Sequence, residues 1–247
     1  MPTNPSSIVE QHIQEMLDIG AIPGSKSPFS SNVVIVRKND GTIRFCIDFR
    51  KLNARTKKDA YAIPRVENTL HILSGPKYFS KLDFKSGYWQ VELDEADKEK
   101  TAFQVWGVVF FEANRMPFGI CNAPATFQRL MERCMGELNL KDCLIYLDDI
   151  IIYSADIDSH LQRLDAVFKR LAEFNLTIKP NKCEFFETET TYLGHVVFSE
   201  GIQADPKKTV AVHRWSVPKT PRRFANFLAL PAIIGVLSKT TLVLQDH

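Results

Sequence analysis

Apolar residues recur at helical spacing in four parts of the chain. Near the start, Ile8, Ile13, Met16 and Leu17 predict an amphipathic helix that Gly20 would end. The four helices expected from this spacing cover residues 7–19, 123–138, 157–174 and 205–215.

The two central helices carry further signals. Asn122 directly precedes the first of them and is a residue type that caps helix N-termini. In the second, apolar residues at helical spacing predict one buried face. That face would comprise Ile157, Leu161, Leu164, Phe168 and Leu171.

Runs of β-branched and aromatic residues predict strands. Val33–Arg37 and Ile43–Ile47 flank Asn39-Asp40-Gly41-Thr42, and strand, Asp-Gly turn, strand indicates a hairpin. Other extended segments are expected over 78–84, 88–93, 102–115, 143–154 and 192–198, with a charged turn or short helix over 94–101. The mixture favours an α+β fold whose antiparallel sheet is backed by the helices at 123–138 and 157–174.

Composition is that of an ordinary globular protein. The 247 residues are 45% hydrophobic and 24% charged, which allows one large domain or two small ones. The formal net charge is +2, so no global basic field indicates nucleic acid. Local basic clusters occur at Lys51 to Lys58, Lys207-Lys208 and Arg222-Arg223, and each taken alone fits a solvated face.

Cysteine usage and the N-terminus bear on the cellular compartment. The five cysteines are odd in number and have no CxxC spacing, which argues against a disulfide framework or a zinc site. Residues 1–7 lack the pattern of a signal peptide, and no apolar run is long enough to span a membrane. We therefore expect an intracellular protein, cytoplasmic or nuclear, with no membrane partner.

Two adjacent carboxylates interrupt the apolar run that surrounds Tyr146-Leu147-Asp148-Asp149. Burying like charges side by side is costly, and no Lys or Arg lies between Lys141 and Arg163 to offset them. One interpretation is a solvated hairpin tip, where Asp is a favoured residue. The other is a site for divalent cations, which take oxygen ligands and bridge phosphates.

A cation site of that kind needs a carboxylate from another strand. Asp83 ends the apolar segment Lys81-Leu82-Asp83 and precedes Ser86-Gly87-Tyr88. A lone Asp at a strand end is more often a turn or cap residue. Its weight comes from being paired with Asp148 and Asp149.

The chain resembles the reverse transcriptases of gypsy-class LTR retrotransposons and, more distantly, those of retroviruses. The resemblance covers about residues 7–218 and rests on several motifs in the family's order. These motifs are Val36–Gly41, Arg44–Asn53, Phe79–Tyr88, Lys100–Phe103, Met116–Phe127, Tyr146–Asp149 and Tyr192–His195. A bare YxDD is weak support, but this many motifs at the expected spacing are specific.

The resemblance implies a right-hand polymerase fold with fingers, palm and a truncated thumb. It implies that residues 1–80 hold the N-terminal helix and fingers, and 81–198 the palm with a fingers insertion. Residues 199–247 would form the exit from the primer grip and an incomplete or divergent thumb.

The resemblance also implies the chemistry of an RNA-directed DNA polymerase. Asp83, Asp148 and Asp149 would be catalytic and would hold two Mg²⁺, or Mn²⁺, with the main-chain carbonyl of Phe84 as a further ligand. The primer 3′ hydroxyl would attack the α-phosphate of a dNTP, and pyrophosphate would leave. Such transfer depends mainly on positioning and charge stabilisation.

Six residues match positions that hold the incoming nucleotide in the family. Arg44 with Arg37 or Lys38 would bind the triphosphate, for which a guanidinium is well suited; the alternative is an exposed basic hairpin. Tyr88 would exclude a ribose 2′ hydroxyl by bulk; the alternative is a core tyrosine. Phe118-Gly119 lies where the templating pair would pack, and Gly119 would permit close backbone approach.

A second set would contact the RNA or DNA template and its primer. The resemblance places Tyr146 and the hairpin of Leu193, Gly194 and His195 at the primer. The basic residues Arg55, Lys57 and Lys58 could touch template phosphates, which would make binding salt-dependent.

The sequence departs from the family after Trp215 to Thr220. There the family continues into a helix and paired tyrosines, whereas here Pro221 to Leu230 follow at once, and 231–247 show no resemblance. Three hypotheses follow: an active polymerase core of low processivity, a non-catalytic fragment that binds nucleic acid or protein, and a product whose tail cannot complete the fold. The oligomeric state is left open.

Overall fold

The computed structural model describes residues 5–37, 43–61, 66–105 and 109–206. The chain divides into two compact units that it enters more than once. The first unit comprises Met1–Ala62, Phe84–Arg133 and Asn175–Thr177, and the second comprises Ile63–Asp83, Cys134–Phe174 and Ile178–His247. The division at residues 80 and 198 that the resemblance implies is a functional one, and it stays a prediction.

A four-stranded sheet lies in the first unit, in the order β2-β1-β4-β5. Its strands are β1 (Ser31–Arg37), β2 (Ile43–Ile47), β4 (Phe103–Val105) and β5 (Val109–Phe111). β1 and β2 are antiparallel with Arg37 opposite Ile43, which confirms the expected strands; the turn over 39–42 lies outside the described residues. β1 pairs with β4 in parallel.

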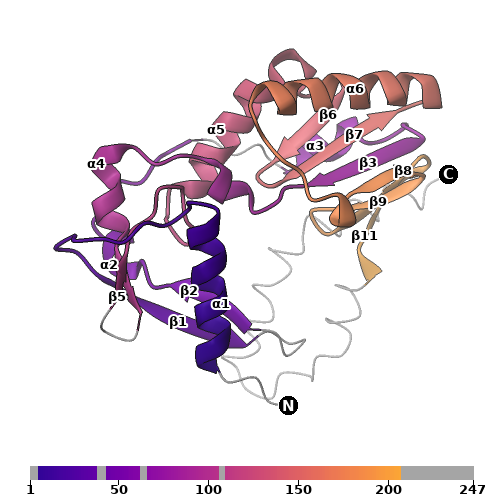
Figure 1. Ribbon diagram of the computed structural model, residues 1–247. Helices are drawn as coiled ribbons and strands as arrows, with labels where there is room; N and C mark the ends of the chain where they lie inside the picture. The colour runs from indigo at the N-terminus through magenta and orange to yellow at the C-terminus, as the bar shows by residue number, and fades with distance from the viewer. Residues whose placement is uncertain (1–4, 38–42, 62–65, 106–108, 207–247) are drawn as a thin grey trace, which may run out of the picture. The chain divides into compact units, whose positions relative to one another are not determined.

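Helix α1 (Pro5–Asp18) confirms the first expected helix, and Figure 1 shows it crossing the β1–β2 hairpin. Its expected apolar face is confirmed in part. Val9 and Ile13 are buried in a cluster that Met16 joins, whereas Leu17 is exposed. The helix ends at Gly20 in a Schellman arrangement, with φ +65° and the N–H of the next residue bonded to the Met16 carbonyl.

Short helices complete the first unit. These are α2 (Arg50–Asn53), the 3₁₀ turns η1 (Gly87–Gln90) and η2 (Glu99–Thr101), α4 (Glu95–Lys98) and α5 (Ala123–Met135), whose last residues enter the second unit. The expected strand over 88–93 is wrong in its first half, because Tyr88 packs between aromatic rings and the backbone coils to place it there. The helix expected to reach residue 138 ends at Met135, since Gly136 takes φ +51° and begins the 3₁₀ turn η3 (Gly136–Leu138).

An antiparallel sheet of order β6-β7-β3-β8 forms the centre of the second unit. Its strands are β3 (Tyr78–Asp83), β6 (Cys143–Tyr146), β7 (Asp149–Ser154) and β8 (Glu184–Glu187). One face carries Phe79, Leu144, Ile151 and Tyr153, which form a core with residues of α3 (Val66–Ile72) and the neighbouring small sheet.

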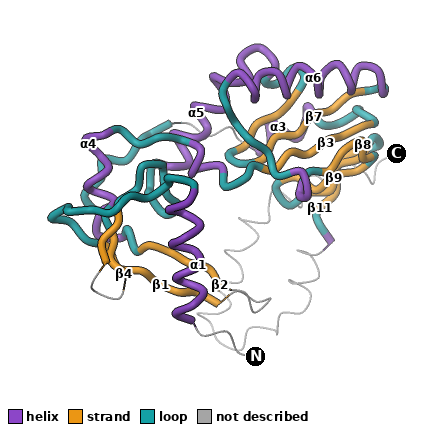
Figure 2. The backbone as a smooth tube through the Cα atoms, viewed as in Figure 1, coloured by secondary structure: helices purple, strands orange, loops and turns teal. Residues whose placement is uncertain are grey.

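Helix α6 (Ile157–Glu173) covers the other face of this sheet, as Figures 1 and 2 show. The helix was expected, but its buried face was only partly identified. Ile157, Leu161 and Phe168 are exposed. The residues that α6 buries are His160, Leu164, Val167 and Leu171. A polar residue therefore occupies a position that hydrophobic spacing alone does not select.

The small sheet has three antiparallel strands: β9 (Glu189–Tyr192), β10 (His195–Phe198) and β11 (Gly201–Ala204). The single strand expected over 192–198 is thus wrong. Leu193 and Gly194 form a two-residue turn with φ +50° and +86°, as a type I′ hairpin requires. This agrees with the hairpin that the resemblance implies.

The architecture is α+β, and the β6-β7-β3-β8 sheet is antiparallel, as the sequence predicts; the β2-β1-β4-β5 sheet is mixed. Residues 207–247 lie outside the described residues. They include the basic pairs at 207–208 and 222–223, all but the first two residues of the helix expected over 205–215, and most of the segment 199–247 interpreted as the primer-grip exit and incomplete thumb. Within the described ranges, no helix has the length and apolar character to cross a membrane.

Candidate active site

The turn between β6 and β7 presents Asp148 at its tip. Tyr146 and Asp149 pair across the two strands, so Leu147 and Asp148 form a two-residue turn. Leu147 takes φ +53°, a conformation that side chains with a Cβ rarely adopt. Such strain costs about 1–3 kcal/mol and persists only where the surrounding structure enforces it. Here the buried β6–β7 ladder provides that enforcement.

Asp83 lies directly opposite Asp149 in the β3–β7 ladder, at the end of β3. Three carboxylates thus occupy one end of the sheet in the second unit, as the sequence predicts. Burial raises the pKa of Asp148, and the charges of Asp149 and Asp83 raise it further. Its Oδ1 atom is buried and accepts no hydrogen bond from any described residue. The turn therefore holds a carboxylate oxygen that is short of a positive partner.

Two lysines offset the other carboxylates. Lys81 Nζ lies 3.3 Å from Asp149 Oδ1, and Lys182 Nζ lies 3.7 Å from Asp83 Oδ2. Lys81 stands two residues before Asp83 on β3, which places both side chains on one face of the sheet. Lys182 ends the 3₁₀ turn η4 (Pro180–Lys182) that leads into β8.

The end of β3 is held in place by the chain that precedes β8. The Lys179 N–H donates to the Asp83 carbonyl at 2.8 Å, and Cys183 Sγ lies 3.9 Å from the same oxygen. These contacts fix the backbone that carries Asp83 without using its side chain.

The donor set suits a hard divalent cation. Carboxylate oxygens are the ligands that Mg²⁺ takes from proteins, and the unbonded Asp148 oxygen provides one. Among the described residues, however, no group of three His, Cys, Asp or Glu side chains converges as a ready metal cluster. Asp83 and Asp149 are instead turned toward their lysines. An ammonium group and a metal cation satisfy the same carboxylate oxygens, so the two lysine contacts are compatible with a cation site.

Phe84, Tyr88 and Phe118 belong to the first unit. Tyr88 is buried, with its ring 5.0 Å from that of Phe118 and 5.4 Å from that of Phe127. Phe84 packs edge-to-face on Phe127 at 5.5 Å. Tyr88 is therefore a core residue on one side, while Phe118 on its other side is exposed.

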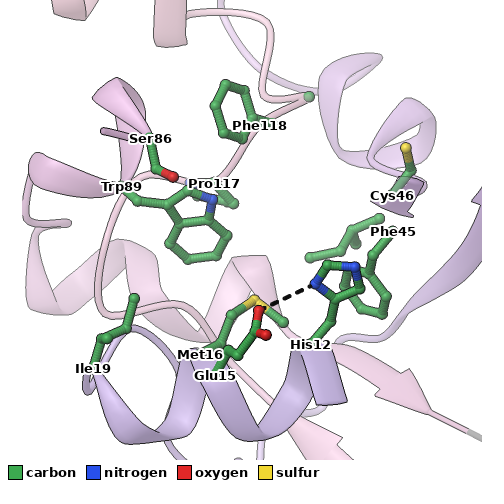
Figure 3. A pocket seen from close by; sticks show the side chains of 12 residues that line it. His12, Glu15, Met16, Ile19, Phe45, Cys46, Ser86, Trp89, Pro117 and Phe118 are labelled. Atoms are coloured by element: carbon green, nitrogen blue, oxygen red, sulfur yellow. Dashed lines mark ion pairs between the residues drawn. The ribbon is translucent and has the colours of Figure 1, made fainter. Parts of the chain in front are cut away.

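A cavity of about 830 Å³ in the first unit is lined by two of the predicted site residues, Phe118 and Gly119. Figure 3 shows Trp89, Pro117 and Phe118 on one wall, Phe45 and Cys46 on another, and α1 along the floor. The volume lies within the range of small-molecule sites.

Gly119 owes its identity to its backbone. Its φ is +99°, while an added Cβ would meet Phe49 and Ile47 at the ordinary distances of 3.5 and 3.6 Å. The turn around it is fixed by Asn53, whose side chain donates to the Gly119 carbonyl at 2.8 Å and accepts from the Cys121 N–H at 2.9 Å.

The structure describes most, but not all, of the basic residues predicted to lie at the site. Arg37 and Arg44 lie opposite one another's neighbours in the β1–β2 ladder, and Lys38 lies outside the described residues. Arg55, Lys57 and Lys58 are exposed on the segment after α2, and none of them forms an ion pair with another described residue.

Asn122 fixes the basic segment rather than capping α5 with its side chain. Its amide donates to the Lys57 carbonyl at 2.9 Å and accepts from the Asp59 N–H at 3.0 Å. The expected capping hydrogen bond is therefore replaced by hydrogen bonds to the backbone of Lys57 and Asp59, which are distant along the chain.

The predicted primer-side residues lie in the second unit with the carboxylates. Tyr146 and Leu193 pack partly buried against the same core cluster, and His195 is buried. Leu193 and Gly194 at the hairpin tip are both half-buried.

Comparison with known sequences decides the family. The sequence model of the reverse transcriptase (RNA-dependent DNA polymerase) family matches residues 36–197. The chain belongs to the reverse transcriptase family.

Its relatives are transposon polyproteins, which confirms the resemblance to gypsy-class elements. The chain is 41% identical over 227 residues to the retrovirus-related Pol polyprotein from transposon 297 of Drosophila melanogaster, covering 90% of this chain and 21% of that protein. It is 36% identical over 240 residues to that from transposon gypsy of the same species, covering 95% and 23%. This reverse transcriptase chain thus spans about a fifth of the length of these relatives.

Solved structures confirm the polymerase fold with fingers and palm. The foamy viral protease-reverse transcriptase in complex with dsDNA matches with a TM-score of 0.83 at 24% identity, covering 94% of this chain and 48% of that one. The same protein in complex with an RNA/DNA hybrid matches with a TM-score of 0.77 at 23% identity, covering 96% and 33%. At this identity the likeness establishes the fold.

Several residues that contact the predicted site residues were missed from sequence. Lys81 could have been found, because alternation along a strand puts it on the face of Asp83. Lys182 and Asn53 had no such signal, since their partners lie 99 and 66 residues away along the chain.

Proposed function

We propose that this chain forms the catalytic core of an RNA-directed DNA polymerase that adds dNTPs to a primer 3′ end. The observation that carries the proposal is the set of Asp83, Asp148 and Asp149 at one end of the β3–β7–β6 sheet in a member of this family. A strained turn and an unbonded carboxylate oxygen at its centre are features of functional sites.

The three aspartates would hold two Mg²⁺, or Mn²⁺, with the Phe84 carbonyl as a further ligand. Bound there, the cations would neutralise the phosphates and assist attack of the 3′ hydroxyl on the α-phosphate. The side chains supply the negative charge that keeps them in place, and Lys81 and Lys182 would be displaced from their carboxylates. The chain's own task is to position the reactants.

The incoming nucleotide would be held by residues of the first unit. The cavity that Phe118 and Gly119 line has the size for part of a nucleotide, and β2, which carries Arg44, forms one wall of it. Arg37, Lys38 and Arg44 would bind the triphosphate. Tyr88, rigidly packed between two rings, would exclude a 2′ hydroxyl.

Residues in each unit would contact template or primer. The neighbours solved with dsDNA and with an RNA/DNA hybrid support binding of such duplexes. Arg55, Lys57 and Lys58, exposed without ion pairs among described residues, suit phosphate contacts. Tyr146 and the hairpin of Leu193, Gly194 and His195 would contact the primer.

Primer extension on an RNA template, with dNTPs and Mg²⁺, tests the proposal. Extension by the parent protein and its loss in Asp148→Asn is the expected result. Melting curves must show that both proteins fold cooperatively. If the parent protein folds but extends no primer with either Mg²⁺ or Mn²⁺, the proposal that it is a polymerase is refuted.

A further inference from the structure

A buried histidine joins two strands of the catalytic sheet from behind. His160, in the first turn of α6, has no exposed surface. Its Nε2 lies 2.7 Å from Ser80 Oγ on β3, and its Nδ1 lies 2.9 Å from Ser154 Oγ on β7. We call Ser80, His160 and Ser154 the clamp.

The remaining contacts of the two serines fix every proton in the clamp. Ser154 Oγ donates its hydrogen to the Asp156 carbonyl at 2.9 Å, so it must accept from Nδ1–H of His160. Nε2 is then the acceptor, and Ser80 Oγ donates to it. This leaves Ser80 Oγ free to accept from the Phe186 N–H, which lies 3.1 Å away. A neutral imidazole thus satisfies each group once.

The clamp reaches a third strand at an irregular point. β8 pairs with β3 at Phe79 and Lys81, and the register shifts between them. Phe186 takes φ +57° there. Its N–H bonds to the Ser80 hydroxyl in place of a strand carbonyl, so the clamp closes the gap in the ladder.

Each clamped strand leads to a charged residue of the site. Ser80 lies three residues before Asp83 on β3, and Ser154 lies five residues after Asp149 on β7. β8 follows directly on the turn that ends with Lys182, the partner of Asp83. The serines face α6, while Asp83 and Lys81 face the opposite side of the sheet.

We propose that His160 is a positioning residue, which fixes the mutual register of β3, β7 and β8 and thereby the spacing of Asp83, Asp149 and Lys182. The inference rests on the proposed function for its catalytic consequence, but the register itself does not depend on activity. Because a one-residue slip would turn Asp83 to the wrong face, the sheet needs such a device where its ladder is irregular.

His160→Phe tests the proposal by keeping a ring in the slot and removing both nitrogens. Val167→Ala is the matched control, because Val167 is fully buried on the same helix and the change removes only apolar contacts. Amide hydrogen exchange is compared at equal distance below each melting temperature. We expect faster exchange at Phe186 and at the Asp83 and Asp149 ends of their strands in His160→Phe, and no such local change in Val167→Ala.

The second readout is the Mg²⁺ concentration that half-saturates primer extension. By analogy with residues that orient metal ligands, we expect it to rise about tenfold in His160→Phe. Val167→Ala should leave it unchanged. Equal exchange at these amides in the two variants, with an equal Mg²⁺ requirement, would show that His160 only fills space.

The experiments distinguish failure of the proposed polymerase function from failure of the positioning role of His160. If the folded parent extends no primer, the proposed function is lost and the exchange experiment alone decides the role of His160. If His160→Phe does not fold, Ser80→Ala with Ser80→Thr as its control takes its place. Ser80→Thr retains the hydroxyl and should keep Phe186 protected, whereas Ser80→Ala should not; equal protection in both would overturn the clamp.

Discussion

The ammonium group of Lys81 lies 3.3 Å from a carboxylate oxygen of Asp149, diagonally across the β3–β7 ladder. With Lys182 beside Asp83, it supplies the positive charge that the sequence around Asp148 lacks. The pair is about one quarter to one third exposed, so its direct contribution to stability is modest, on the order of 1 kcal/mol or less. Its larger significance is that Lys81 and a metal cation would compete for one oxygen.

Lys81→Met should therefore make folding more dependent on metal. In EDTA the three carboxylates lose a neutralising partner, so we expect a lower melting temperature than that of the parent. Adding Mg²⁺ should raise the melting temperature more in the variant than in the parent, because binding to the folded state alone stabilises it. Calorimetry with and without Mg²⁺ measures both. Lys85→Met, an exposed lysine outside any described ion pair, is the control and should show neither effect.

Asp148→Asn should stabilise the metal-free protein while abolishing primer extension. The pKa of Asp148 is raised by burial and by its acidic neighbours, so the folded state binds its proton more tightly than the unfolded chain. Stability is therefore lost as pH rises above about 4, the pKa of an unfolded aspartate. The amide removes that loss, so at pH 7 in EDTA we expect a melting temperature a few degrees higher.

Two comparisons make the Asp148 experiment decisive. Asp149→Asn should raise the melting temperature by less, because this variant also loses the ion pair with Lys81. In excess Mg²⁺ the parent should have a higher melting temperature than Asp148→Asn, which reverses the order expected without metal. If Asp148→Asn melts at a lower temperature than the parent at pH 7 without metal, the charge of Asp148 does not destabilise the metal-free fold, and the prediction is wrong.

The fold was predictable where one local signal dominated. The Asp-Gly turn flanked by β-branched runs identified β1 and β2, and the apolar run around Asp148 identified β6 and β7. Failures occurred where tertiary contacts overrode propensity. Tyr88 suits a strand, but its backbone forms a 3₁₀ turn and its ring packs at a tilt against Phe118.

Asp83, Asp148 and Asp149 could be picked out as a set because the motifs and their order contain them, and their catalytic role is the proposal made above. Their electrostatic partners could not. Lys182 contacts Asp83 from the turn η4, 99 residues further along the chain, and His160 lies on the buried face of α6 at a position that the apolar pattern did not include. Buried polar groups are chosen by distant partners, here Ser80 and Ser154, which no local pattern reveals.

Mild acid should destabilise the second unit through His160. Burial lowers the pKa of this histidine, and the positive charge of Arg163 lowers it further; the other groups around it, Ser80, Ser154 and the Phe186 backbone, are uncharged. With a folded pKa below that of the unfolded chain, stability is complete above about pH 6.5 and is lost as pH falls through the folded pKa. Protonation would also leave the Ser80 hydroxyl hydrogen without its acceptor.

Melting temperatures measured from about pH 7.5 to about pH 5, a range that includes the pKa of an unfolded histidine, test the acid effect. The parent should lose stability across it. His160→Phe should show a flatter profile from a lower starting point. Equal slopes for the two proteins would assign the pH dependence to other groups.

Gly119→Ala should destabilise the first unit through the backbone alone. An added Cβ meets nothing closer than 3.5 Å, so the cost comes from a φ of +99°, about 1–3 kcal/mol. Gly24→Ala is the control, since Gly24 has open space and no positive φ, and it should be nearly neutral. Urea unfolding of both variants separates conformational strain from crowding; equal stability of the two would indicate that the 119 turn readily adopts another conformation.

Tyr88→Ala should weaken both stability and the discrimination against ribonucleotides. The ring is buried between Phe118 and Phe127, and deleting such a ring costs about 3–5 kcal/mol, so the comparison must be made well below the melting temperature. If the ring excludes the 2′ hydroxyl, the ratio of kcat/KM for dNTP over NTP should fall in Tyr88→Ala. Tyr88→Phe keeps the ring between the same neighbours and should keep the ratio. A ratio that stays constant in Tyr88→Ala, while overall activity falls with stability, would leave Tyr88 a core residue and move the sugar discrimination elsewhere in the cavity that Phe118 lines.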